Sequence, residues 1–168
     1  MDNNVSFVKN IDNLGRIVIP MDIRRKMMIN TGDVLSITCS DDNILLKKYS
    51  TLDNSFKVIE IVKCFIEMLN MKIILMDKDS VVYSNVVNVN TKLEGSIKSL
   101  VKNGTKLRNH TNEMMIGEQK VKGIYNMIPI ITKEGIEGSL IVFGDVNDHS
   151  YELCEVLSKI IMLEINIA

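Results

Sequence analysis

Several residue types are scarce in this chain, and each scarcity argues against a class of protein. Its 168 residues include no tryptophan, two prolines, two histidines and three cysteines. The cysteines Cys39, Cys64 and Cys154 are odd in number and far apart, which argues against a disulfide framework and against a zinc site. We expect them to be buried, reduced thiols in a cytosolic protein.

Histidine and glycine offer no catalytic motif. His110 and His149 lie in no HExxH, GxSxG or Cys/His arrangement. The most closely spaced glycines, Gly135 and Gly138, fall in a predicted hairpin and form no phosphate-binding loop. We therefore predict a protein that is not an enzyme and that has no metal site and no cofactor.

The chain also lacks an excess of positive charge and a long apolar run. Its net charge is −1 and its pI is near 6.1, whereas domains that bind nucleic acid are usually basic. Residues 1–50 hold seven basic and six acidic side chains, and the rest hold thirteen and fifteen. No segment is long enough to cross a bilayer and no signal peptide is recognisable. We expect a soluble, cytoplasmic protein without a membrane partner, in which any DNA site depends on where charges are placed.

Arginine is rare but clustered. The chain has four arginines among twenty basic residues, and Arg16, Arg24 and Arg25 fall within ten positions of one another. The planar guanidinium carries five N–H donors, and it binds phosphates and guanine edges in a geometry that lysine does not offer. This cluster favours an interaction with nucleic acid.

The first fifty residues predict a small unit rich in β-structure. β-branched runs alternate with turn residues, and one short amphipathic segment follows a proline. A unit of this size buries little apolar surface alone, so we expect it to oligomerise. The predicted elements are strands at 7–11, 16–19, 34–39 and 44–49, and one helix from Pro20 to a cap at Gly32.

The rest of the chain predicts a sheet flanked by its first and last helices, an α+β arrangement. A boundary is expected at 50–54, where turn residues follow the last strand of the first unit. Apolar residues at three- and four-residue steps mark long helices at both ends of the second unit. The predicted elements are helices at 55–69, 93–101 and 147–165, and strands at 72–76, 81–87, within 113–128, at 126–132 and at 139–144.

Three short motifs resemble the AbrB-type swapped-hairpin DNA-binding domain. They are Leu14-Gly-Arg-Ile-Val-Ile-Pro20, Ile23-Arg-Arg25 and Leu45-Leu-Lys-Lys-Tyr49, and the similarity covers roughly residues 5–52. Beyond this segment, the layout and length resemble the stage V sporulation protein T type of regulator, which joins an AbrB-like domain to a GAF-like domain. The resemblance implies an α+β fold with an N-terminal swapped-hairpin β-barrel over residues 1–52 and a C-terminal GAF-like sheet domain flanked by helices over 53–168.

The resemblance also implies a partner and a site. Two chains would interleave their strands in one barrel and bind double-stranded DNA, at AT-rich or deformable promoter sites, as a dimer or a tetramer. The DNA-binding residues carried over from the family pattern are Lys9, Arg16, Arg24 and Arg25. Family members often have a second basic residue where this chain has Asn10.

Two interpretations of residues 53–168 stay open. A GAF-like domain implies a pocket for an unidentified small-molecule or peptide effector, and Arg108, His110 and Tyr125 are the candidate ligand-binding residues. Alternatively, the wide apolar stripes of the helices at 55–69 and 147–165 favour a scaffold in which these helices form a dimerisation bundle.

The leading hypothesis is a bacterial transcription regulator of sporulation or of another growth-phase transition. One rival is an antitoxin-like module that binds a protein, since AbrB-like barrels also occur in antitoxins. Antitoxins usually end in a disordered tail, whereas this chain ends in an apolar helix. Another rival is a ligand sensor with degenerate DNA binding, which the near-neutral charge and Asn10 would explain.

Overall fold

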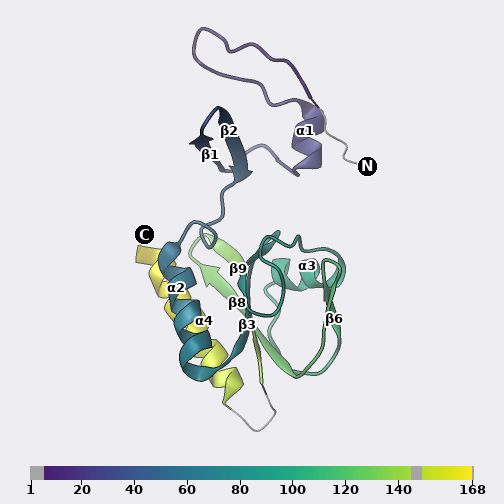
Figure 1. Ribbon diagram of the computed structural model, residues 1–168, viewed down its shortest axis with the longest axis vertical. Helices are drawn as coiled ribbons and strands as arrows, with labels where there is room; N and C mark the ends of the chain where they lie inside the picture. Colours follow the sequence, from purple (N-terminus) through teal and green to yellow (C-terminus); the bar gives the residue numbers. More distant parts are fainter. Residues whose placement is uncertain (1–5, 145–148, 168) are drawn as a thin grey trace. The chain divides into compact units, whose positions relative to one another are not determined.

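The chain divides after Tyr49 into two units, and each is described separately below (Figure 1). The computed structural model describes residues 6–144 and 149–167. The boundary derived from the sequence lies three residues later, after Leu52. Within the described residues, no helix combines the length and the hydropathy that a membrane crossing requires.

The N-terminal unit contains one helix and one hairpin. Helix α1 spans Met21–Lys26, and strands β1 (Leu35–Ser40) and β2 (Asn43–Lys48) pair antiparallel. The turn between the strands has two residues, of which Asp41 takes the left-handed conformation (φ 48°) that a short polar side chain tolerates. The predicted strands at 34–39 and 44–49 are thus present, each displaced by one residue.

Helix α1 begins and ends differently from the sequence prediction. Pro20 is the N-cap residue and is not part of the helix, because its ψ of 147° is not helical. At the other end, Met28 takes the left-handed conformation (φ 53°). The N–H groups of Met28 and Ile29 then donate to the carbonyls of Arg25 and Arg24, at 3.1 and 2.8 Å. This pair of hydrogen bonds is a Schellman motif. The predicted cap at Gly32 was therefore wrong, because the helix has already ended.

The strands predicted at 7–11 and 16–19 are not formed in the single chain. Two backbone hydrogen bonds close the turn between these segments, from the amide of Asp12 to the carbonyl of Arg16 (3.1 Å) and from the amide of Gly15 to the carbonyl of Asp12 (2.9 Å). A strand needs a ladder of hydrogen bonds, and one copy of this segment provides no neighbouring strand. No side chain of residues 6–49 is buried either. A barrel built by two chains remains a prediction.

The C-terminal unit is a five-stranded antiparallel sheet with helices on both faces. Its strand order is β4-β3-β9-β8-β5, and β6 and β7 form a separate hairpin. The elements are α2 (Phe56–Leu69), β3 (Lys72–Asp77), β4 (Val81–Ser84), α3 (Gly95–Lys102), β5 (Leu107–His110), β6 (Met114–Ile116), β7 (Gln119–Val121), β8 (Tyr125–Thr132), β9 (Gly135–Phe143) and α4 (Ser150–Ile167). The mixed α and β composition expected from the sequence is confirmed.

Two apolar cores lie on opposite faces of this sheet. Along β9, Leu140 and Val142 point to one core and Ile141 points to the other, as the two-residue period of a strand requires. Helices α2 and α4 cover the first face and contact each other (Figure 1). Helix α3 and the β6–β7 hairpin cover the second face. The first and last helices of the unit therefore share one face of the sheet.

Small polar side chains fix α4 to the sheet. The hydroxyl of Ser158 donates to the carbonyl of Pro129 at 3.2 Å, and the amide of Asn126 donates to the hydroxyl of Ser150 at 2.8 Å. The buried thiol of Cys154 lies between them, four residues from each serine. This spacing keeps all three groups on the helix face that meets β8. The predicted start of this helix, at Asn147, lies outside the described residues.

Two features of the sheet escaped the sequence prediction. Strand β5 was missed because it is a short edge strand of mostly polar residues. Gly138 was assigned to the connection between β8 and β9, but it lies inside β9. A Cβ at this position would lie 2.0 Å from the carbonyl oxygen of Met76 and 2.7 Å from Cδ1 of Leu52. The glycine therefore permits a close approach of two strands and of the fully buried Leu52.

Candidate nucleic-acid interface

All four predicted DNA-binding residues lie in the N-terminal unit. Lys9 and Arg16 belong to the irregular segment before α1, and both are exposed. Arg24 and Arg25 lie in the last turn of α1. Cations at this end of a helix interact favourably with the partial negative charge of its last carbonyls, and the Schellman motif limits how far the helix extends.

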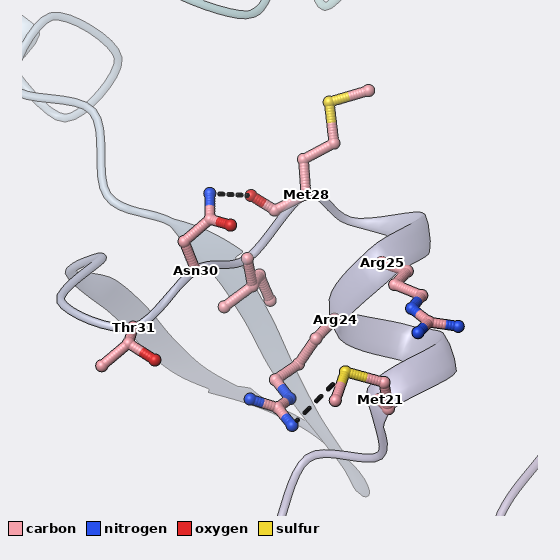
Figure 2. A pocket seen from close by; sticks show the side chains of 7 residues that line it. Met21, Arg24, Arg25, Met28, Asn30 and Thr31 are labelled. Atoms are coloured by element: carbon pink, nitrogen blue, oxygen red, sulfur yellow. Dashed lines mark hydrogen bonds between the residues drawn. The ribbon is translucent and has the colours of Figure 1, made fainter.

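Arg24 and Arg25 line a surface hollow of about 400 Å³ (Figure 2). Arg24 is half-buried, its Nη2 lies 3.6 Å from the sulfur of Met21, and its Nε is covered without a hydrogen-bond partner. Arg25 is exposed, and its guanidinium points in a different direction from that of Arg24 (Figure 2). The other residues of the hollow are Met21, Met28, Ile29, Asn30 and Thr31.

Arg16 occupies the end of a tight turn and is bound to an acidic neighbour. Its Nε donates to Oδ2 of Asp12 at 2.8 Å, while 71% of its side chain stays exposed. Hydrogen bonds from the backbone and the side chain of Arg16 lower the pKa of Asp12. Asp12 is therefore a negatively charged residue beside Arg16 in the candidate interface, and the sequence pattern did not single it out. The signal was present, since Asp and Asn before a glycine commonly accept hydrogen bonds from the backbone two residues on.

The single chain brings together two of the four candidate residues. The hollow at the end of α1 includes neither Lys9 nor Arg16. Within the described residues, Arg24 and Arg25 form no ion pair with a carboxylate, in contrast to Arg16. The unit thus presents two kinds of arginine, one bound to an acid and two that are not.

Of the three candidate ligand-binding residues of the C-terminal unit, two contact each other and the third lies apart. Arg108 pairs with Glu152 (3.2 Å) and stacks over the ring of Tyr151 (4.5 Å), both on α4. His110 instead makes an edge contact with Tyr125, with ring centroids 5.3 Å apart. Tyr125 belongs to the core under α3, where burial raises the pKa of its hydroxyl. Arg108 therefore lies on the α4 side of the sheet, whereas His110 and Tyr125 lie on the α3 side.

No described residues gather into a group of three or more His, Cys, Asp or Glu side chains that could hold a metal ion. Several of the described carboxylates pair instead with basic side chains. Glu113, for example, accepts hydrogen bonds from Lys120 and Lys122 at the β6–β7 hairpin, and these bonds lower its pKa.

The N-terminal unit matches a known family. Residues 8–53 match the family described as antidote-toxin recognition MazE, bacterial antitoxin. The same unit is similar to the transition state regulatory protein AbrB of Bacillus subtilis (strain 168), with 44% identity over 46 residues, or 27% of this chain and 48% of the relative. The chain carries a MazE- and AbrB-type N-terminal domain.

Similarity to known regulators extends beyond this MazE- and AbrB-type domain. The chain is 28% identical to stage V sporulation protein T of Bacillus subtilis (strain 168) over 146 residues, which cover 82% of each protein. It is also 39% identical to the putative transition state regulator Abh of the same organism, over 46 residues that cover 27% of this chain and 50% of the relative. The predicted resemblance to AbrB and to stage V sporulation protein T is therefore confirmed.

Proposed function

We propose that the protein is a cytoplasmic transcription regulator of a sporulation or growth-phase programme that binds double-stranded DNA as a dimer or higher oligomer. The observation that carries this proposal is the arginine cluster on the MazE- and AbrB-type domain. The names of the relatives, a sporulation protein and transition state regulators, support the biological setting.

Self-association is argued from the apolar surface of the N-terminal unit. Fourteen large apolar side chains between Phe7 and Tyr49 are exposed in the single chain, among them Val8 at 94% and Val18 at 72%. Each such side chain gains about 1.5 to 3 kcal/mol when it is fully buried, and a surface of this extent on a soluble protein marks an interaction site. A second copy of the same unit is the proposed cover.

Dimerisation would also compensate for the small charge of the chain. One copy presents Lys9, Arg16, Arg24 and Arg25, and a dimer doubles this set on one assembly. Arginines that contact phosphates release counterions, so affinity falls steeply with salt, with a logarithmic slope of about −0.9 per phosphate neutralised. With so few side chains available to reach base edges, recognition would also depend on how easily the promoter DNA deforms.

The C-terminal unit is proposed to be a GAF-like regulatory domain that adds contacts between copies. Val156 and Leu163 lie seven residues apart on α4 and are 48% and 64% exposed, and Met68 on α2 is 82% exposed. This spacing places apolar side chains on the outer face of the helix pair, where a bundle with another copy would cover them. An unidentified effector would bind the α3 side, near His110 and Tyr125.

The test is DNA binding by the full chain, measured by fluorescence anisotropy on AT-rich promoter duplexes over a range of salt. The variant Arg24→Ala with Arg25→Ala is expected to weaken binding about tenfold or more and to reduce the salt slope by about 0.9 for each phosphate that the variant no longer neutralises. The matched control is Arg108→Ala, since this arginine lies on the C-terminal unit. Unchanged affinity in the double variant, with circular dichroism like that of the wild type, would overturn the proposal.

The family description that mentions toxin recognition favours a second candidate, a module that neutralises a protein. Co-expression with candidate small toxic partners tests it: stable co-purification, together with no DNA binding, would replace the regulator proposal. A third outcome, negligible DNA binding at low salt with a metabolite that raises the melting temperature, would instead indicate a ligand sensor.

A further inference from the structure

Asp12 builds the turn that carries Arg16. Its Oδ1 accepts hydrogen bonds from the amides of Leu14 (3.0 Å) and Arg16 (2.9 Å). The amide of Gly15 donates to the carbonyl of Asp12 at 2.9 Å, and Gly15 has a φ of 76° that suits glycine. The turn is thus closed from both sides, and it fixes where the Arg16 side chain leaves the backbone.

The second oxygen of Asp12 fixes the far end of the same side chain. Oδ2 accepts from Nε of Arg16 at 2.8 Å, in an ion pair whose side chains are 43% and 71% exposed. Because this hydrogen bond uses Nε, the edge formed by Nη1 and Nη2 faces away from Asp12. That edge presents two parallel N–H donors, the arrangement that matches O6 and N7 of guanine in the major groove.

The carboxylate also changes what Arg16 binds well. A phosphate that approaches Arg16 meets the negative charge of Asp12 beside it, whereas one that approaches Arg24 or Arg25 meets no paired carboxylate among the described residues. A guanine edge carries no net charge, so Asp12 penalises it less. The Asp12–Arg16 ion pair therefore disfavours binding of Arg16 to phosphates in general. It still leaves the Nη1–Nη2 edge of Arg16 oriented to donate to a base.

We infer that Asp12 is a positioning residue that makes Arg16 a guanine-edge contact rather than a general phosphate contact, so that Asp12 sets the preference for specific over random DNA. This inference rests on the proposed function. It assigns different roles within the cluster, since Arg24 and Arg25 supply affinity and Arg16 supplies discrimination.

The variant Asp12→Asn isolates this role. Its Oδ1 can still accept from the two backbone amides, while the Nδ2 that replaces Oδ2 no longer accepts from Arg16. The full chain is titrated with two duplexes of equal length, one of random sequence and one being the genomic fragment most enriched in a pull-down with the wild type. We expect tighter binding of the random duplex, a steeper salt slope on it, and a specific-to-random ratio that falls about 5- to 100-fold.

Comparison variants separate positioning from folding. Asp12→Ala also removes the turn and is expected to weaken binding to both duplexes. In the Arg16→Ala background, Asp12→Asn is expected to leave the ratio unchanged. Equal weakening of both duplexes by Asp12→Asn, or an unchanged ratio, would overturn the inference while the regulator proposal stands. No DNA binding by the wild type would overturn both.

A measurement on unaltered protein covers the case in which Asp12→Asn does not fold. Each guanine of the specific duplex is replaced in turn by 7-deazaguanine, which lacks the N7 acceptor. The wild type is expected to lose affinity at one guanine per half-site, and Arg16→Ala is expected to be insensitive there. If no guanine shows this difference, Arg16 does not contact a guanine edge and the inference fails.

Discussion

The two units of this chain bury apolar side chains to opposite extents. The C-terminal unit has a core on each face of its sheet, whereas residues 6–49 bury no side chain at all in one copy. Both units are rich in Ile, Leu, Val and Met, so the difference does not come from composition. It arises because the strands of the C-terminal unit find partners within the chain, while the segments at 7–11 and 16–19 do not.

The largest expected effect is loss of the whole N-terminal fold on dilution. In the proposed dimer, residues 1–49 take their core from a second copy, so the folded fraction of a fragment of these residues should fall as the concentration drops from micromolar to nanomolar. A fragment of residues 50–168 should keep its secondary structure over the same range. Circular dichroism with sedimentation at each concentration makes the comparison. If the fragment of residues 1–49 is folded as a monomer, the predicted difference between the two units is wrong.

Within the C-terminal unit, Gly138→Ala should be the most damaging small substitution. The added Cβ would lie 2.0 Å from the backbone oxygen of Met76, so β3 and β9 must separate. We expect a loss of about 4 kcal/mol or more in the free energy of unfolding, measured with urea. Gly135→Ala is the matched control, because nothing lies within 4 Å of its added Cβ and only its φ of 123° is strained. A loss of about 1 to 2 kcal/mol is expected there.

Asn126 tests how much a buried polar side chain contributes to the stability of the C-terminal unit. This buried side chain accepts from the amide of Asn109 and donates to the hydroxyl of Ser150, both at 2.8 Å. Asn126→Leu removes both hydrogen bonds and leaves the Asn109 amide without this acceptor, so we expect a loss of about 2 to 3 kcal/mol in urea unfolding. Asn166→Leu, on the exposed side of α4, should change stability by less than about 0.5 kcal/mol. Similar losses for the two variants would contradict this account.

The smallest effect concerns thiol chemistry. Cys39 in β1 and Cys64 in α2 are exposed, so the prediction of buried cysteines was wrong for these two. Cys154 is fully buried, and burial raises the pKa of its thiol from 9.0 to about 12. At pH 8, maleimide should label Cys39 within minutes and Cys154 only on unfolding, as peptide mass spectrometry would show. The raised pKa also means that stability is lost as pH rises from about 9 to 12, because the unfolded thiol ionises first. Cys154→Ala should lessen that alkaline loss.

The sequence predicted an element well where the period of its apolar residues and the length of the segment indicate the same type of structure. Helix α2 begins one residue after its predicted start, with Ser55 as its N-cap, because apolar residues recur at every turn. Strand β5 was missed because edge strands need few apolar residues, and Gly138 was misplaced because a close approach between strands leaves no local signal. The cap of α1 was misplaced because Met28, rather than a glycine, takes the left-handed conformation.

For the candidate site, the residue types were predictable but their pairing was not. The cluster of Arg16, Arg24 and Arg25 stands out in a chain that is poor in arginine. The bond from Arg16 to Asp12 depends on the exact turn geometry at Gly15. Likewise, the separation of Arg108 from His110 follows from a bulge in β5, where the register shifts between Leu107 and His110 and Asn109 takes the left-handed conformation. The sequence did not reveal this strand.

The buried residue Leu52 determines where the chain can be divided without damage to the core of the C-terminal unit. Its side chain is fully buried in the core under α2 and α4, and the hydroxyl of Thr51 lies 3.4 Å from Glu137 of β9. A gene fusion joined after Leu52 would deprive the C-terminal unit of part of its core. A fusion joined before Ser50 would keep that core intact. Recombination between genes for proteins of this layout should therefore tolerate crossovers near Tyr49, whereas crossovers a few codons downstream should be selected against.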